Sequence, residues 1–231
     1  MKNINEYKTI QRSAKEVLGE IKHFIVKGVT EKDISDECIE LLREKGITEC
    51  WYHGVPALVL CGSRSRVSVS GRDYIASEEM VSDTDLVTID LSPSKENIWG
   101  DCARSFAVEN GIVVDQPENE DFISGFVTEM KLHEELLNFA KADTKFCELY
   151  KFANNLIIEM DFENLDFMKN LGHSIETDIS KRKYIENGNA NILSSVECFT
   201  FEPHIAVSGS KWGFKHENIY YFDDNGIICE L

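Results

Sequence analysis

The chain has 231 residues, of which 42% are hydrophobic, so it can bury a sizeable core, and its length suits a single α/β domain. Lysine and arginine number 24 against 41 acidic residues, and the formal net charge of -17 would repel a phosphate backbone. This balance argues against nucleic acid as a partner, although carboxylates gathered in a cleft could recruit divalent cations.

The seven cysteines are scattered along the chain and include neither a Cys-x-x-Cys pair nor zinc-finger spacing, so we expect reduced, buried thiols. The N-terminus lacks the apolar core of a signal peptide, and no stretch approaches the ~18 apolar residues of a membrane span. These features predict a cytoplasmic protein that does not use a membrane as a partner.

A helix pair is predicted at the start of the chain. Apolar residues recur at helical spacing from Ile10 to Ile25, and Gly28 follows as a C-cap. Thr30 has the features of an N-cap, with acidic residues in the next turn and an apolar face that runs on to Gly46.

Short runs rich in β-branched residues follow, separated by Gly, Ser, Pro and Asp clusters, and they predict strands and tight turns. These runs are 55–60, 67–69, 86–91 and 105–108. Two further helical patterns cover about 119–140 and 145–159. The chain ends in a strand-rich region over 196–207 and 219–222, followed by a turn at 223–226.

The two halves of the chain resemble each other in the order of their predicted elements. Leu18, Glu20, Lys27 and Thr30 recur at one constant offset as Leu132, Glu134, Lys141 and Thr144. Four identities also arise by chance in helical sequence, so duplication and coincidence both remain open. We expect an α/β (α+β) domain over residues 1–231, with halves of about 1–114 and 115–231 around one curved sheet and a cleft where they join.

Two aspartates mark the first candidate site. Asp90 ends an apolar run, and Asp101 stands eleven residues later, just before another run. A turn between antiparallel strands can bring such carboxylates side by side, where a divalent cation would remove their repulsion. The alternative is that Asp90 caps a turn and Asp101 lies on the surface.

Three residues downstream add to this pair. His173 stands in Gly-His-Ser-Ile, and Glu202 and Glu217 are embedded in apolar, strand-like surroundings. A carboxylate in such surroundings is costly unless it is paired or bound to a metal. Each of these residues taken alone could equally be a satisfied structural residue.

In their order along the chain, these segments resemble the pita-bread fold enzymes, which include methionine aminopeptidases, prolidases, aminopeptidase P and creatinase. The resemblance covers nearly the whole chain. It rests on KGVTEKDI in the first helix pair, LVTIDLSP with GDCARSF, GHSIE, FTFEPHI and KHENIYYF. It implies a pita-bread fold of two pseudo-symmetric halves, each with a helix pair and antiparallel strands, without the separate N-terminal domain of many prolidase-like members.

The resemblance also implies a metal centre. The family's ligands fall on Asp90, Asp101, His173, Glu202 and Glu217, with Asp101 and Glu217 bridging two divalent ions. An oxygen-rich set with one imidazole suits Mn, Fe(II) or Co better than a thiolate-type zinc site. Two such ions can share a water and polarise a carbonyl, and Glu202 would act as the catalytic proton shuttle. The implied activity is that of a hydrolase of the aminopeptidase or prolidase type.

Two departures put ordinary peptidase activity in doubt. Where the family's peptidases present two further cleft histidines, this chain has Ser70 and Ser180. Those histidines position the peptide and stabilise charge on its carbonyl, so their loss could cost several kcal/mol of transition-state stabilisation.

Other residues could compensate as substrate-binding groups. By strand parity, His204 lies on the same side as Glu202, whereas His216 points away from the face that Glu217 uses and favours a structural role. His53 could line the cleft or plug the sheet. Arg64, with Arg66 and Arg72, flanks the Ser70 turn and could receive a substrate carboxylate or simply be solvated.

Three functions remain open at this point. The first is a dinuclear-metal hydrolase acting on a peptide or small amide. The second is a lyase, dehydratase or amidinohydrolase-like enzyme on the same fold, acting on a small carboxylate metabolite. The third is an inactive binding protein. The expected partner is a small-molecule or short-peptide substrate, and a second subunit in a homodimer could shape the mouth of the cleft.

Overall fold

The computed structural model describes residues 4–231, and it is a mixed α/β fold with antiparallel sheets. In the first half, α1 (Ile4–Glu20) and α2 (Glu31–Glu44) cover a four-stranded sheet in the order β2-β3-β6-β7. Its strands are β2 (Ala57–Cys61), β3 (Asp85–Leu91), β6 (Cys102–Glu109) and β7 (Ile112–Val113). A small sheet, β1-β4-β5, joins β1 (Glu49–Cys50), β4 (Pro93–Lys95) and β5 (Ile98–Trp99).

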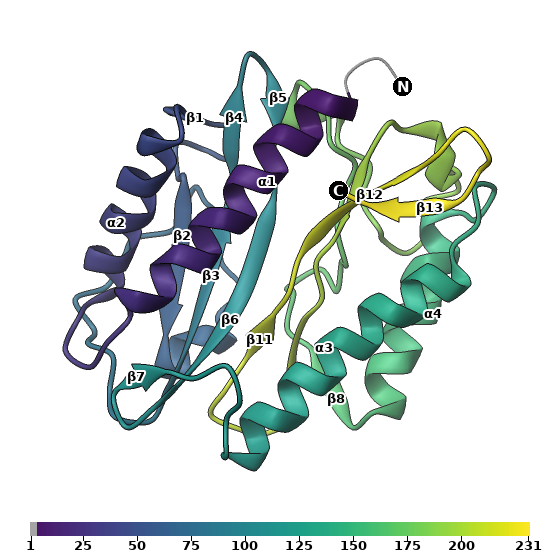
Figure 1. Ribbon diagram of the computed structural model, residues 1–231. Coiled ribbons are helices and arrows are strands. Elements are labelled where there is room, and N and C mark those ends of the chain that lie inside the picture. Colours follow the sequence, from purple (N-terminus) through teal and green to yellow (C-terminus); the bar gives the residue numbers. More distant parts are fainter. Residues whose placement is uncertain (1–3) are drawn as a thin grey trace.

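The second half repeats this order of helices and strands. Figure 1 shows α3 (Glu120–Phe139) and α4 (Phe146–Glu159) lying together on the side away from α1 and α2. Two three-stranded sheets follow, β11-β10-β8 and β13-β12-β9. Their strands are β8 (Phe162–Asn164), β9 (Phe199–Phe201), β10 (His204–Val207), β11 (Phe214–Lys215), β12 (Asn218–Phe222) and β13 (Ile228–Glu230). A duplication of the first half would produce this order of helices and strands. The duplication itself stays a prediction.

Local signals place the helix starts where the sequence predicts them. The hydroxyl of Thr30 accepts a hydrogen bond from the Asp33 amide (3.1 Å), and the Asp33 carboxylate accepts one from the Thr30 amide (3.0 Å). This capping box starts α2. The side chain of Asn119 accepts from the Asp121 amide (2.9 Å) at the start of α3.

Two sequence predictions are wrong in detail. The first helix ends at Glu20, and a short 3₁₀ turn (Ile21–His23) continues the chain, although Ile21 and Ile25 remain fully buried. The segment 67–69 forms no strand. It leaves the 3₁₀ turn Gly62–Arg66 and runs along the wall of a cleft, where no neighbouring strand pairs with its backbone.

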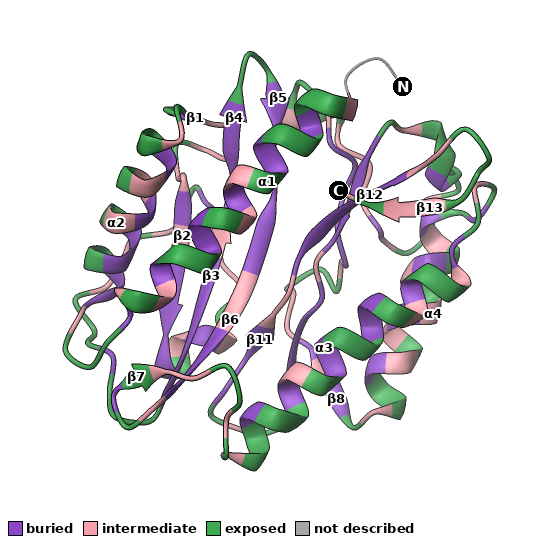
Figure 2. Ribbon diagram, in the orientation of Figure 1, coloured by how far each residue is buried: buried purple, intermediate pink, exposed green. Residues whose placement is uncertain are grey.

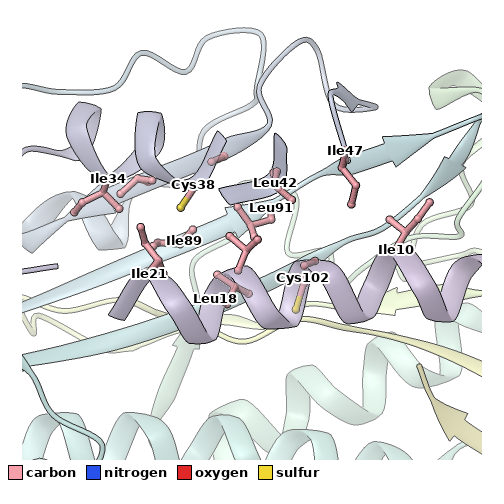
Figure 3. Packing of buried hydrophobic residues seen from close by; sticks show 14 of the residues in the cluster. Ile10, Leu18, Ile21, Ile34, Cys38, Leu42, Ile47, Ile89, Leu91 and Cys102 are labelled. Carbon is pink, nitrogen blue, oxygen red and sulfur yellow. The ribbon is translucent and has the colours of Figure 1, made fainter. Parts of the chain in front are cut away.

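Alternation along β3 separates the core from the cleft. Figure 2 shows α1 and α2 burying the faces that they turn toward the sheet. Figure 3 shows Leu18 of α1 and Cys38 of α2 beside Ile89 and Leu91 of β3 within one hydrophobic cluster. Because successive strand residues point to opposite faces, Asp90 is directed to the other side of the sheet, away from the helices.

Within residues 4–231, none of the helices combines the length and the apolar character that crossing a lipid bilayer requires.

Candidate metal centre

The strand register around Ala103 brings three of the predicted ligands together. Ala103 of β6 is the cross-strand partner of Asp90 on one side, and on the other side it forms a bridge with Glu217, whose amide donates to the Ala103 carbonyl (3.0 Å). Asp101 stands two residues before Ala103, so β-alternation points it to the same face. Three carboxylates therefore surround one small, buried alanine side chain.

A second pairing places His173 beside Glu202. The chain around Gly172 runs along β9: the His173 amide donates to the Thr200 hydroxyl (3.1 Å), and the Thr200 amide donates to the His173 carbonyl (2.7 Å). The amide of Glu202, just after β9, donates to the carbonyl of Leu171 (2.9 Å). These bonds hold the two residues on neighbouring stretches of backbone.

The five predicted ligands form one cluster. Carboxylate oxygens of Asp90, Asp101 and Glu217 lie within 4.8 Å of one another. The Nε2 atom of His173 is 3.5 Å from Asp101 Oδ2 and 3.9 Å from Glu202 Oε1. The structure thus brings together side chains from β3, the start of β6, the end of β9, the start of β12 and the loop before β9.

Several oxygens of this cluster lack protein partners. Among residues 4–231, Asp101 Oδ2 and both carboxylate oxygens of Glu217 are buried and accept no hydrogen bond. Burial, with Asp90 and Glu202 nearby, raises the pKa of Asp101 well above its usual range. Burial and the Asp101 carboxylate raise the pKa of Glu217 in the same way. Such a set is unfavourable alone and suits a divalent cation, which would supply the missing positive charge.

The tautomer and the neutral charge of the His173 imidazole suit a metal ligand. His173 Nδ1 lies 3.0 Å from the Ser174 carbonyl, an acceptor, so Nδ1 carries the hydrogen and the Nε2 lone pair faces the carboxylates. Burial lowers the pKa of His173 to about 3, which keeps the ring neutral. Gln11 of α1 holds the backbone of Asp101 through both of its amide atoms, at 2.6 and 3.0 Å. One imidazole and four carboxylates therefore form a donor set that fits a divalent cation.

Lys215 is a member of the cluster that the sequence reasoning missed. Its Nζ lies 2.5 Å from Asp90 Oδ2 and 3.2 Å from Glu202 Oε2. Burial alone would lower the pKa of Lys215, but Asp90, Glu202 and Glu217 raise it well above its usual range, so the ammonium stays charged. A signal existed in the sequence, because Lys215 and Glu217 share strand parity.

The cluster lies in a cleft with a volume of about 470 Å³. Four of the predicted substrate-binding residues line this cleft: His53, Ser70, Ser180 and His204. Arg64 is directed elsewhere, since its Nε donates to the buried carboxylate of Glu31 (2.8 Å). The structure thus does not bring Arg64 to the metal cluster.

The two histidines nearest to the glutamate ligands lie in different surroundings. His204 is buried, and its Nε2 lies 2.7 Å from the Ser65 carbonyl, so this nitrogen donates to the backbone of the 3₁₀ turn Gly62–Arg66. His216 packs against the ring of His133 (centroid separation 4.5 Å) and lies 3.3 Å from the Asn218 side chain. Strand parity predicted that His216 and Glu217 would point to opposite sides.

The burial of His204 predicts that the folded protein loses stability as the pH falls below neutral. Burial lowers the pKa of His204 to about 4, whereas an unfolded histidine titrates near ~6.5. As pH falls through this window the unfolded chain binds a proton that the folded protein does not, so the free energy of unfolding falls. When the pH is lowered from 7 to 5, the free energy of unfolding should fall in both proteins. We expect the fall to be about 2 kcal/mol smaller for His204→Gln than for the wild type, as measured by urea titration at each pH. Equal losses would contradict the prediction.

Arg182 also lines the cleft, and no sequence reasoning singled it out. It lies close to its chain neighbour Tyr184 and to the consecutive residues Trp51 and Tyr52, which are distant in the sequence. Only the folded structure reveals the contact between these two segments.

A model of a known protein family matches most of the chain. The family model described as metallopeptidase family M24 matches residues 5–224. A search of curated proteins found no significant match.

Solved structures match nearly the whole chain. An X-Pro aminopeptidase from Thermotoga maritima has a TM-score of 0.81 at 23% identity, over 99% of this chain and 60% of its own. The prolidase from Pyrococcus furiosus has a TM-score of 0.81 at 21% identity, over 100% of this chain and 63% of its own. A methionine aminopeptidase from Thermotoga maritima has a TM-score of 0.78 at 16% identity, over 99% of this chain and 96% of its own.

These likenesses confirm the predicted pita-bread fold. This chain spans about 60% of the length of the X-Pro aminopeptidase and the prolidase.

Proposed function

Because the chain belongs to metallopeptidase family M24, we propose that it is a hydrolase that uses two divalent metal ions to cleave a peptide or another small amide. The observation that carries this proposal is the group of three buried carboxylate oxygens, on Asp101 and Glu217, that no group of residues 4–231 satisfies. Asp101 lines a cleft of about 470 Å³, which is large enough for a short peptide or a small amide.

The five clustered side chains are the proposed metal ligands. Asp90, Asp101, His173, Glu202 and Glu217 would together hold the ions, and Asp101 and Glu217 are the most buried carboxylates among them. When bound, the ions supply a Lewis acid for the substrate carbonyl and a water of lowered pKa. The donor set favours Mn, Fe or Co over Zn.

Glu202 is the residue proposed to hold and move a proton. Its side chain is 23% exposed, against 4% for Asp101, so it can reach a substrate in the cleft. One of its oxygens faces His173 and the other faces Lys215. The Lys215 ammonium lies beside the second oxygen and orients this carboxylate, which can accept a proton and pass it to the leaving nitrogen.

The experiment is a metal analysis combined with a panel of dipeptides and small amides in the presence of Mn, Fe(II) or Co. We expect turnover that a chelator abolishes, and we expect Glu202→Gln to lower kcat about 100-fold or more. The matched control is Glu163→Gln, which alters a glutamate paired with Arg66 (2.7 Å) outside the cluster. Metal binding without cleavage of any member of the panel would contradict the hydrolase.

A second candidate function is favoured by Ser70 and Ser180, which line the cleft where related peptidases present imidazoles. Neither hydroxyl can carry a positive charge at neutral pH, so the cleft provides less stabilisation for charge developing on a peptide carbonyl. The alternative is a lyase, dehydratase or amidinohydrolase-like reaction on a small carboxylate metabolite. Metal binding without peptide cleavage supports this alternative.

We also propose a cytoplasmic location. All seven cysteines lie within the described residues, and each is a free thiol, as a reducing compartment requires.

A further inference from the structure

A second cavity lies on the helix side of the first-half sheet. In Figure 1, β6 passes between α1 and α3, and a cavity of about 300 Å³ is lined there by residues of both helices and of β6 and β7. Because successive strand residues point to opposite faces, Arg104 is directed to this side, whereas Ala103 faces the metal cluster. Among residues 4–231, this cavity shares no lining residue with the cleft. We call it the seam pocket, and its lining includes Lys15, Leu18, Gly19, Arg104, Val113 and Phe126.

Much of the wall of the seam pocket is apolar. Leu18 and Phe106 are buried, and Val113 and Phe126 are half-buried. The ring of Phe126 is held edge-on against that of Phe214, with 5.9 Å between the ring centres. A hydrocarbon group that entered the pocket would remove more of these side chains from water, which is favourable.

A glycine in the last turn of α1 leaves the seam pocket open. Gly19 lines the pocket, and no atom lies within 4 Å of the position that its Cβ would take. Its backbone is not left-handed, so neither conformation nor close packing requires glycine here. Glycine generally costs a helix stability relative to alanine. A larger side chain at this position would extend into the pocket and fill part of it.

Arg104 brings an unpaired positive charge to the seam pocket. Its Nη1 donates to the carbonyls of Ala103 and Glu217, and its Nη2 donates to the side-chain oxygen of Asn218, each at 2.7 Å. These bonds fix the guanidinium in place. Within residues 4–231, Arg104 forms no ion pair and its Nε donates to no acceptor. Burial raises the pKa of the nearby Glu129 well above its usual range, which favours a neutral carboxyl there and leaves the charge of Arg104 uncompensated.

Two lysines of α1 line the same pocket. Lys15 Nζ pairs with Glu230 (2.6 Å) and also donates to the carbonyl of Leu231, and Lys22 Nζ pairs with Asp115 (2.5 Å). The Glu230 and Asp115 side chains are 40% and 79% exposed, and ion pairs on the surface contribute only about 0–1 kcal/mol. An anion in the pocket can therefore compete for the lysines. Three cationic side chains thus meet at one apolar pocket, although acidic residues outnumber basic ones by 41 to 24.

We propose that the seam pocket is a second binding site, which takes a small amphipathic monocarboxylate with its head group at Arg104 and its hydrocarbon part against the apolar wall. The inference goes beyond the proposed hydrolase and does not depend on it. The Nε hydrogen and the remaining hydrogen of Nη2 can donate to the two carboxylate oxygens. A single negative charge suits a chain with a net charge of -17 better than a dianion would, and a volume of about 300 Å³ limits the ligand to a small molecule.

The test uses octanoate and its uncharged analogue octanamide as probes, with binding to the metal-free protein measured by calorimetry. We expect octanoate to bind about tenfold more tightly than octanamide. Arg104→Met should remove about tenfold of the affinity for octanoate and leave that for octanamide nearly unchanged. Gly19→Leu should weaken the binding of both probes about tenfold or more, because the added side chain occupies the space of the hydrocarbon part.

The control variant is Ser13→Leu, which adds the same side chain to α1 outside the seam pocket and should change neither affinity. Arg104 also holds the backbone of Glu217, so thermal unfolding of each variant is recorded. Gly19→Leu leaves the Arg104 contacts in place, and its result therefore stands even where Arg104→Met fails to fold.

Octanoate binding that Gly19→Leu leaves unchanged would place the ligand elsewhere and overturn the proposal. Equal affinities of the wild type for octanoate and octanamide, or no binding of either, would overturn it as well. Neither metal nor cleavage enters the measurement, so failure of the seam pocket and failure of the proposed hydrolase are recognised separately.

Discussion

Replacing Asp101 by asparagine is expected to abolish metal-dependent stabilisation while making the metal-free protein more stable. Asp101 Oδ2 is buried without a partner, and the carboxylates of Asp90 and Glu202 oppose its ionisation. In the absence of a cation, removing this charge relieves repulsion, and we expect a gain of about 1–3 kcal/mol in the free energy of unfolding. In the presence of the cation, the asparagine withdraws an anionic ligand on which the site depends.

The measurement is thermal unfolding with chelator and with saturating manganese. The wild type should be stabilised by about 3 kcal/mol when the free ion is at ~100 times its Kd, and Asp101→Asn should show no such gain. Asp224→Asn, an exposed acid in the turn before β13, is the matched control and should behave as the wild type does in both conditions. A metal-free Asp101→Asn protein that is less stable than the wild type would contradict the assignment of this carboxylate to a cation site.

The second large effect is expected from Gly172→Ala. Gly172 has φ of +137°, which L-residues rarely adopt, and a Cβ there would lie 2.2 Å from the carbonyl oxygen of Thr200. The obstacle is the backbone of β9, so no side-chain rotation relieves it. We expect a loss of about 3 kcal/mol or more in the free energy of unfolding, measured in urea.

The same change should disturb the site, because Gly172 directly precedes His173 and the residues that follow it pair with the backbone leading to Glu202. The control is Gly188→Ala, where φ is +88° but no atom lies within 4 Å of the added Cβ. That variant carries only the backbone strain, about 1 kcal/mol, and should keep its metal content. Equal stability of the two variants would show that the close approach to β9 is not what requires glycine.

The sequence predicted those features that depend on neighbouring residues. The capping box at Thr30 and Asp33 determines the start of α2 locally, and the apolar run at 86–91 corresponds to β3. The segment 67–69 shows the limit of such reasoning. Its valines are typical of a strand, but a strand needs a partner, and the chain there lies along the cleft without one.

The candidate site also contains residues that the sequence predicted and residues that it missed. Residue types and their order, with the resemblance to the pita-bread enzymes, were enough to name the five candidate ligands that the structure gathers into one cluster. Lys215 was missed, although it has the strand parity of Glu217, because a lysine among carboxylates is recognised only when its neighbours are known. Arg64 was a candidate for substrate binding or for a solvated loop residue, yet in the fold it pairs with Glu31 of α2.

What the sequence by itself determined is therefore the four α-helices, the longer strands and the identity of the candidate acidic and imidazole ligands. Helical periodicity, strand alternation and capping are properties of short stretches. Only the tertiary structure decided which charged groups face one another. Ala103 pairs with both Asp90 and Glu217, and Arg182 meets the rings of Trp51 and Tyr52 from a distant segment of the chain. Such contacts follow from sheet register and loop packing, which depend on the free energy of the whole fold.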